Sequence, residues 1–247
     1  MTRTFLFTVG AKGGVGKSFF AEALLDYAEE NSIPWKAFDC DGSTRTLRRV
    51  FGDDPRVKEY EMRDQGSLDA MLQDAAESEE SLIVADLRAG SDAEFLPFFT
   101  AVLEELGDDL KEAGLDICAA ALIANETDSI FATAQWAKQL KNNVRWAFIE
   151  NEVRGPVTPL RETQEGRALT AACQPIQIVL PAMNVEDAGN LRKANLSIRT
   201  LMAKIQAKEK VEGLTDLGPK ARIKKYRRGL HEAFDQFVPQ LLKLNDE

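Results

Sequence analysis

The residues best suited to chemistry lie in a glycine-rich segment near the start of the chain. Residues 10–18 (GAKGGVGKS) fit the phosphate-loop pattern G-x-x-x-x-G-K-[ST] at Gly16, Lys17 and Ser18, with Ala11 in place of the leading glycine. The glycines permit the backbone conformations that turn N–H groups toward a polyphosphate, and the N-terminus of a following helix favours anions. We therefore expect Lys17 to contact the β- and γ-phosphates and the Ser18 hydroxyl to ligate Mg²⁺. The dinucleotide pattern G-x-G-x-x-G fails, because Phe19 stands where its third glycine belongs.

Two further segments place carboxylates directly after apolar runs. Asp39 and Asp41 end the run that begins at Trp35, and Asp86 follows the apolar residues 82–85. Ligands of open α/β sheets bind at the carboxyl ends of the strands, so we expect these acids at the same edge as the glycine-rich loop. Four apolar residues that close on an acid have the Walker B form, in which Asp86 holds Mg²⁺.

Lys12 adds a second lysine inside the loop, five residues before Lys17. With it, the segment KGGVGKS resembles the deviant Walker A motif of the ParA/MinD superfamily of ATPases, and the similar segments together span about residues 4–200. The resemblance implies that Lys12 reaches the phosphates bound by the partner subunit of a nucleotide-sandwich homodimer. Hydrolysis would then depend on dimerisation, by the logic of an arginine finger. The catalytic set that we expect is Lys12, Lys17 and Asp41.

The same resemblance assigns roles to residues outside the loop. Asp41 corresponds to the acid that orients the attacking water and contacts the Mg²⁺ shell, with Asp39 as a supporting residue. Gly90 would lie near the γ-phosphate, although the proline frequent in that segment is absent here. Asn151 is the candidate to read adenine, and Pro181 the candidate to pack on the base. The expected ATP-binding residues are Gly13, Gly14, Val15, Gly16, Lys17, Ser18, Phe19, Gly90, Asn151 and Pro181, and the expected Mg²⁺ ligands are Ser18, Asp41 and Asp86.

These residues require a parallel sheet to position them. Short apolar runs alternate with helically spaced segments, which predicts an α/β fold with a doubly wound, mostly parallel sheet and helices on both faces, as in P-loop NTPases. We expect a single domain over residues 1–247. The expected strands are 4–9, 35–38, 81–85, 117–124, 144–149 and 176–180, and the expected helices are 19–30, 68–77, 94–106 and 188–205.

Composition excludes several other classes of protein. The 247 residues include no apolar run long enough to cross a membrane and no signal peptide, so we expect a cytoplasmic protein. Three widely spaced cysteines indicate buried thiols rather than a disulfide framework. The single histidine, His231, leaves little material for a catalytic triad or a histidine-rich metal centre.

The net charge of −9 conceals a basic segment, residues 220–228, near the C-terminus. Apolar residues at spacings of three and four predict an amphipathic helix at about 219–244. Its charged face is either simply solvated or a surface for non-specific DNA contact through Lys224, Lys225, Arg227 and Arg228. The acidic end of the chain argues against a membrane-seeking helix.

The leading hypothesis is a slow, Mg²⁺-dependent ATPase switch that dimerises on binding ATP and is stimulated by a partner protein. It would position or partition DNA or a protein cargo, as in plasmid partition, transfer or mobilisation. One alternative is an ATP-dependent metabolic enzyme on the same fold. The other is a nucleotide-gated binding module with negligible turnover.

Overall fold

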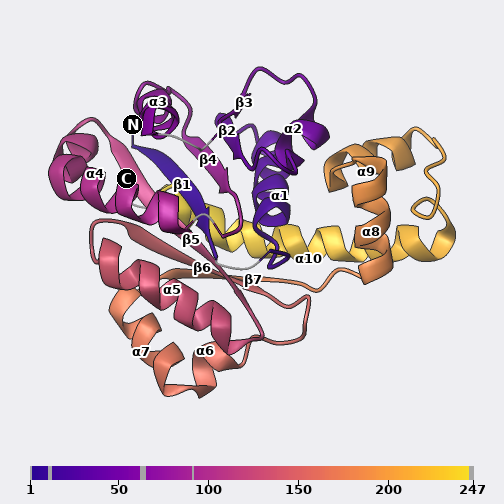
Figure 1. The fold of residues 1–247 in the computed structure, drawn as a ribbon. Helices are drawn as coiled ribbons and strands as arrows, with labels where there is room; N and C mark the ends of the chain where they lie inside the picture. The colour runs from indigo at the N-terminus through magenta and orange to yellow at the C-terminus, as the bar shows by residue number, and fades with distance from the viewer. Residues whose placement is uncertain (1, 11–12, 62–64, 91, 245–247) are drawn as a thin grey trace.

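The computed structural model describes residues 2–10, 13–61, 65–90 and 92–244. Within them, the central element is a seven-stranded sheet in the order β3-β2-β4-β1-β5-β6-β7 (Figure 1). Every neighbouring pair of strands is parallel, so the predicted fold class is confirmed. The strands are β1 Arg3–Val9, β2 Trp35–Cys40, β3 Val57–Glu59, β4 Leu82–Leu87, β5 Leu115–Ala124, β6 Arg145–Asn151 and β7 Ile176–Leu180.

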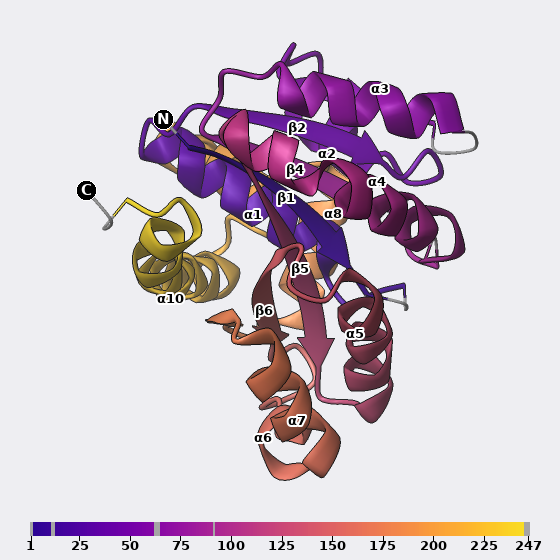
Figure 2. The same ribbon diagram turned by 90° about the vertical axis from the view of Figure 1, so that its left-hand side faces the viewer.

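Helices cover both faces of the sheet (Figures 1 and 2). One face packs against α1, α8, α9 and α10, and the other packs against α3, α4, α5 and α7. The helices are α1 Lys17–Glu30, α2 Thr46–Phe51, α3 Gln65–Ala76, α4 Asp92–Glu112, α5 Thr127–Leu140, α6 Pro159–Glu162, α7 Gln164–Cys173, α8 Val185–Ala194, α9 Ile198–Gln206 and α10 Leu217–Leu241. None of the helices in the described ranges is long and apolar enough to span a membrane.

Strand β1 lies in the middle of the sheet, and its sequence explains why. Phe5 and Phe7 contribute to the core on one face, while Leu6 between them contributes to the core on the other. Side chains alternate across a strand, so apolar residues at successive positions, as at Phe5, Leu6 and Phe7, suit a strand covered on both sides. β1 pairs with β4 on one side and β5 on the other, so the loop that follows it opens where the strand order changes direction.

The predicted helix over residues 188–205 is wrong, because the chain forms two helices there. Asn195 adopts a left-handed conformation with φ of 49° and ends α8. Ser197 then begins α9, since its hydroxyl accepts a hydrogen bond from the Thr200 backbone N–H. Both are ordinary signals for the end and the start of a helix, but the apolar spacing continues across the break and conceals it.

The C-terminal helix α10 is close to its predicted extent. Its apolar stripe is buried against the sheet and α1, as its spacing predicts. The stripe consists of Ile223, Tyr226, Leu230, Phe234, Phe237 and Leu241.

Candidate nucleotide-binding site

The glycine-rich loop connects β1 to α1 and depends on glycine at two described positions. Gly14 and Gly16 have φ of 83° and 99°, a left-handed conformation that other residues rarely adopt. Gly16 also lies directly before Lys17, the first residue of α1. A Cβ atom added at Gly16 would lie 2.4 Å from the Nδ2 atom of Asn151, so any larger residue there would displace the loop or that side chain.

Asn151, at the end of β6, braces this loop. Its Nδ2 donates a hydrogen bond to the Val15 carbonyl oxygen at 2.9 Å, and its Oδ1 accepts one from the Val153 backbone N–H at 3.1 Å. These contacts position the loop backbone, while the predicted adenine contact of Asn151 remains a prediction. Pro181, predicted to pack on the base, lies 3.7 Å from the position that a Cβ atom would take at Gly229 of α10.

Lys17 is buried at the centre of the site, with 7% of the residue exposed. Its Nζ donates a hydrogen bond to the Gly10 carbonyl oxygen at 2.9 Å, across the loop. Burial lowers the pKa of Lys17, while the carboxylates of Asp86, Asp92 and Asp41 act to raise it. A buried ammonium at the start of a helix, beside a glycine-rich loop, suits a polyanion.

Asp86, at the end of β4, is completely buried beside Thr8 of β1. Burial raises the pKa of Asp86 to about 7, although the Ser18 hydroxyl and the Lys17 ammonium act to lower it. The Thr8 hydroxyl donates to Asp86 Oδ1 at 3.3 Å and accepts a hydrogen bond from the Leu87 backbone N–H at 3.0 Å. Among the described residues, Oδ2 of Asp86 has no hydrogen-bond partner. An unsatisfied buried carboxylate oxygen near Ser18 fits a hard cation such as Mg²⁺.

Asp39 and Asp41 lie at the end of β2 and have different environments. Asp39 is buried and accepts hydrogen bonds from the backbone N–H groups of Arg48 and Asp41, at 3.0 and 3.2 Å. It therefore binds the first turn of α2 and supports the β2–α2 connection. Partial burial raises the pKa of Asp41, but hydrogen bonds from Ser43 and Thr44 outweigh it and leave the pKa below its usual value. Asp41 is the carboxylate of the pair that lines the cavity.

A cavity of about 570 Å³ extends from the loop, which is a typical volume for a ligand site. It brings together most of the predicted site residues. Asn151, Pro181 and the completely buried Asp86 do not line it, and Lys12 lies outside the residues that the structure describes. The predicted residues that line it are Gly13, Gly14, Val15, Gly16, Lys17, Ser18, Phe19, Asp41 and Gly90.

Sequence reasoning did not find several groups of the site. Thr8 resembles any other β-prone residue of a strand, so nothing in its neighbours marks it as the partner of Asp86. Glu22 of α1 and Leu191 and Arg192 of α8 also line the cavity. No local motif marks them, because α8 reaches the cavity only through the packing of the folded chain.

The residues present fit a magnesium nucleotide. Ser18 and Asp86 would hold the cation, with Asp41 at the same edge, and Lys17 with the loop amides would hold the phosphates. Mg²⁺, when bound, neutralises charge on the phosphoryl oxygens. The protein groups would then bind and orient the phosphates, and Asp41, which lines the cavity, keeps its predicted role of orienting a water.

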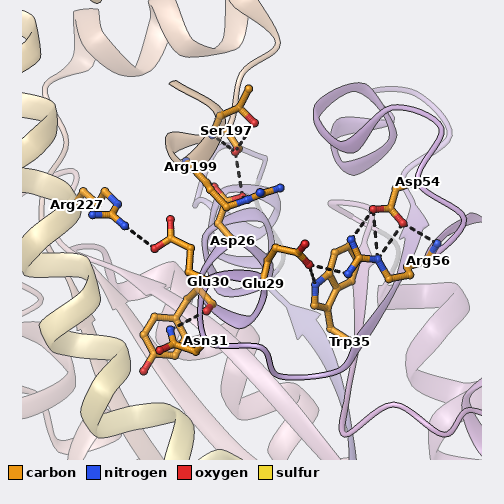
Figure 3. A network of polar contacts seen from close by, with 12 residues as sticks. Asp26, Glu29, Glu30, Asn31, Trp35, Asp54, Arg56, Ser197, Arg199 and Arg227 are labelled. Atoms are coloured by element: carbon orange, nitrogen blue, oxygen red, sulfur yellow. Dashed lines mark hydrogen bonds and ion pairs between the residues drawn. The ribbon is translucent and has the colours of Figure 1, made fainter. Parts of the chain in front are cut away.

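Some cations of the basic segment on α10 form ion pairs with other helices. Lys224, Lys225 and Arg228 are exposed. Arg227 instead pairs with Glu30 of α1 (Figure 3). Arg222 binds Asp187 of α8 through two hydrogen bonds of 2.7 Å each. The arginines at 222 and 227 therefore hold helices together, although Arg222 is itself exposed.

No protein-family model and no curated relative matches the sequence. Several solved MinD structures resemble it. The septum site-determining protein MinD from Pyrococcus horikoshii, complexed with Mg-ADP, aligns with 16% identity and a TM-score of 0.52, over 98% of this chain and 99% of that one. The MinC:MinD cell division protein complex of Aquifex aeolicus aligns with 13% identity and a TM-score of 0.52, over 92% and 95% of the two chains. The Aquifex aeolicus MinD cell division protein aligns with 14% identity and a TM-score of 0.50, over 92% and 96%. The chain therefore has the P-loop ATPase fold of the ParA/MinD type.

Proposed function

We propose that this protein is a Mg²⁺-dependent ATPase of the ParA/MinD type that acts as a nucleotide switch. One observation carries the proposal. Lys17 and Ser18 begin α1 beside a buried carboxylate, Asp86, which has an oxygen without a hydrogen-bond partner among the described residues. Phosphate-binding amides, a lysine, a hydroxyl and a carboxylate are the groups that hold a magnesium nucleotide.

The first test compares two lysines of the loop. Lys17→Ala removes the buried ammonium and should abolish retention of Mg-ATP in equilibrium dialysis. Lys12→Ala should keep nucleotide binding and lose hydrolysis, because Lys12 acts on the partner subunit. Phosphate release from Lys12→Ala at the wild-type rate would refute the trans-acting role. Failure of the wild-type protein to bind Mg-ATP would refute the ATPase itself.

The proposed switch is a homodimer that forms on ATP and separates after hydrolysis. Asp41→Ala removes the carboxylate that orients the attacking water, so this variant should accumulate as an ATP-bound dimer. Size-exclusion chromatography with light scattering, with and without Mg-ATP, measures this directly. A variant that stays monomeric while it binds Mg-ATP would contradict the dimer cycle.

We further propose that the switch positions DNA or a protein cargo in the cytoplasm, with a partner protein that stimulates slow hydrolysis. The exposed cations Lys224, Lys225 and Arg228 support a DNA contact. Stimulation of phosphate release by DNA or a protein favours this function, while stimulation by a small molecule favours a metabolic enzyme. Tight ATP binding without phosphate release, even with DNA present, favours a nucleotide-gated binding module.

A further inference from the structure

Glu22 is a buried carboxyl group that the proposed mechanism does not use. It lies four residues after Ser18 on α1, so both side chains share one face of the helix. Only 8% of the residue is exposed, and it lines the cavity. Burial is the largest of the causes that raise its pKa, followed by the charge of Asp26, while Arg192 acts to lower it. No hydrogen bond to this carboxyl is found in the described part of the chain.

Partial removal of this carboxyl group from water is unfavourable without a hydrogen-bond partner, although its oxygens are not among the fully buried atoms that lack one in the described residues. A glutamine or a methionine at position 22 would avoid the charge. The side chain also lines the cavity and does not pack within a closed core. A hydrogen-bond donor on a ligand in the cavity would satisfy it.

The position of Glu22 indicates which part of a nucleotide it meets. The loop and Ser18 define the phosphate end of the cavity, and Glu22 is one helical turn farther along α1, about 6 Å at ~1.5 Å per residue. The cavity is also lined by Phe19 and by Ala188, Leu191 and Arg192 of α8, and Arg192 is close enough to Glu22 to act on its charge. Apolar side chains with a carboxyl and a guanidinium among them suit a flat, partly polar body rather than more phosphate.

We propose that Glu22 determines specificity at this site by accepting a hydrogen bond from the nucleoside half of the nucleotide. The donor is a ribose hydroxyl or the exocyclic amine of the base. The proposal rests on the proposed nucleotide function. Sites that hydrogen-bond a ligand group discriminate strongly against analogues that lack it, because the buried protein group is then left unpaired.

The test measures binding of Mg-ATP, Mg-2′-deoxyATP, Mg-3′-deoxyATP, the magnesium triphosphate of purine riboside, which lacks the 6-amine, and inorganic tripolyphosphate. Isothermal titration calorimetry is applied to the wild type, to Glu22→Met and to Glu22→Gln, which keeps one carbonyl acceptor. Glu232→Met, on the exposed side of α10, is the matched control.

We expect Glu22→Met to weaken ATP binding about tenfold, the loss of one hydrogen bond, while tripolyphosphate binding is unchanged. Glu22→Gln should recover part of the loss. The wild type should bind one analogue more weakly than ATP, and that analogue identifies the donor. Glu22→Met should not distinguish it from ATP.

ATP affinity of Glu22→Met within about twofold of the wild type would overturn the proposal, as would unchanged discrimination in that variant. An equal loss for tripolyphosphate would also overturn it, because it would place Glu22 in the phosphate end of the site. A wild type that binds neither ATP nor tripolyphosphate refutes the nucleotide function itself, so the two failures are distinguishable.

Discussion

At the scale of single residues, the site combines groups that bind with groups that position. Lys17 crosses the loop to Gly10, Thr8 holds one oxygen of Asp86, and Asn151 holds the loop from β6. Backbone amides bind phosphate well only when the loop already has the right shape, since ordering it on binding would cost affinity. Thr8 and Asn151 should therefore affect affinity without touching the ligand, whereas Lys17 is predicted to contact it.

Asn151→Ala tests this positioning role. The variant loses the hydrogen bonds to Val15 and Val153, so the loop has more conformational freedom before phosphate binds. Binding then costs more conformational entropy. The affinity for Mg-ATP should fall about tenfold, the equivalent of about 1.4 kcal/mol. Calorimetry with tripolyphosphate separates the two roles of Asn151. A parallel fall for tripolyphosphate supports the brace, whereas a fall for ATP alone would contradict it and favour the predicted adenine contact.

Glu22→Gln should change the pH dependence of stability in the absence of nucleotide. Burial raises the pKa of Glu22, and the charges of Asp26 and Asp86 raise it further. These effects outweigh the charge of Arg192, which acts to lower it. The folded wild type therefore keeps a proton that the unfolded chain releases above its ordinary pKa of about 4.3, so stability falls as pH rises from there. Glutamine has no proton to lose. Urea unfolding from about pH 5 to pH 8 should show the variant gaining stability relative to the wild type; a constant difference would contradict this.

At the scale of elements, α1 joins the site to the helices that surround it. Its first turn carries Lys17 and Ser18, and its later turns contact α9 and α10 through charged groups (Figure 3). Asp26 accepts hydrogen bonds from the Ser197 hydroxyl and the Arg199 backbone N–H, each 3.0 Å long. One carboxylate on α1 therefore satisfies the N-terminus of α9 and fixes where that helix starts.

Asp26→Ala should destabilise the fold by about 1–3 kcal/mol, because it leaves the Ser197 hydroxyl and the Arg199 N–H without their partner. Hydrogen exchange should accelerate first in the opening turn of α9. Asp108→Ala provides the control, since Asp108 is exposed on α4 and forms only a surface ion pair with Lys111. Equal urea midpoints for the two variants would contradict the structural role of Asp26.

The elements that sequence reasoning found are those with a strong local pattern. Apolar runs predict β1, β2, β4, β5, β6 and β7, and the glycine-rich segment predicts the loop that precedes α1. Asp86 is predicted because an acid after an apolar strand has few structural reasons to be there. Thr8, Glu22 and the residues of α8 were not predicted, because their roles arise from contacts between segments far apart in sequence.

At the scale of the whole molecule, the distribution of charge decides which surface could meet DNA. The chain carries a net charge of −9, so long-range attraction to DNA must come from a local patch. On α10, Lys224, Lys225 and Arg228 are exposed, while the buried stripe of the same helix fixes it against the core. The cations are therefore held on a rigid element, on the same helix as Arg222 and Arg227, which form ion pairs with other helices.

The triple variant Lys224→Ala/Lys225→Ala/Arg228→Ala tests the proposed DNA surface. If these side chains contact phosphates, each releases counterions, and the slope of log K against log salt should become shallower by roughly 0.9 per lost contact. Fluorescence anisotropy with duplexes of unrelated sequence, at several salt concentrations, should give a similar loss for each, because phosphate contacts carry no sequence information. Lys138→Ala/Lys141→Ala is the control, since both lysines are exposed at the end of α5, on the opposite face of the sheet. A salt slope that is equal in the triple variant and the wild type would contradict the DNA contact and leave α10 as a solvated helix whose function is to cover the sheet.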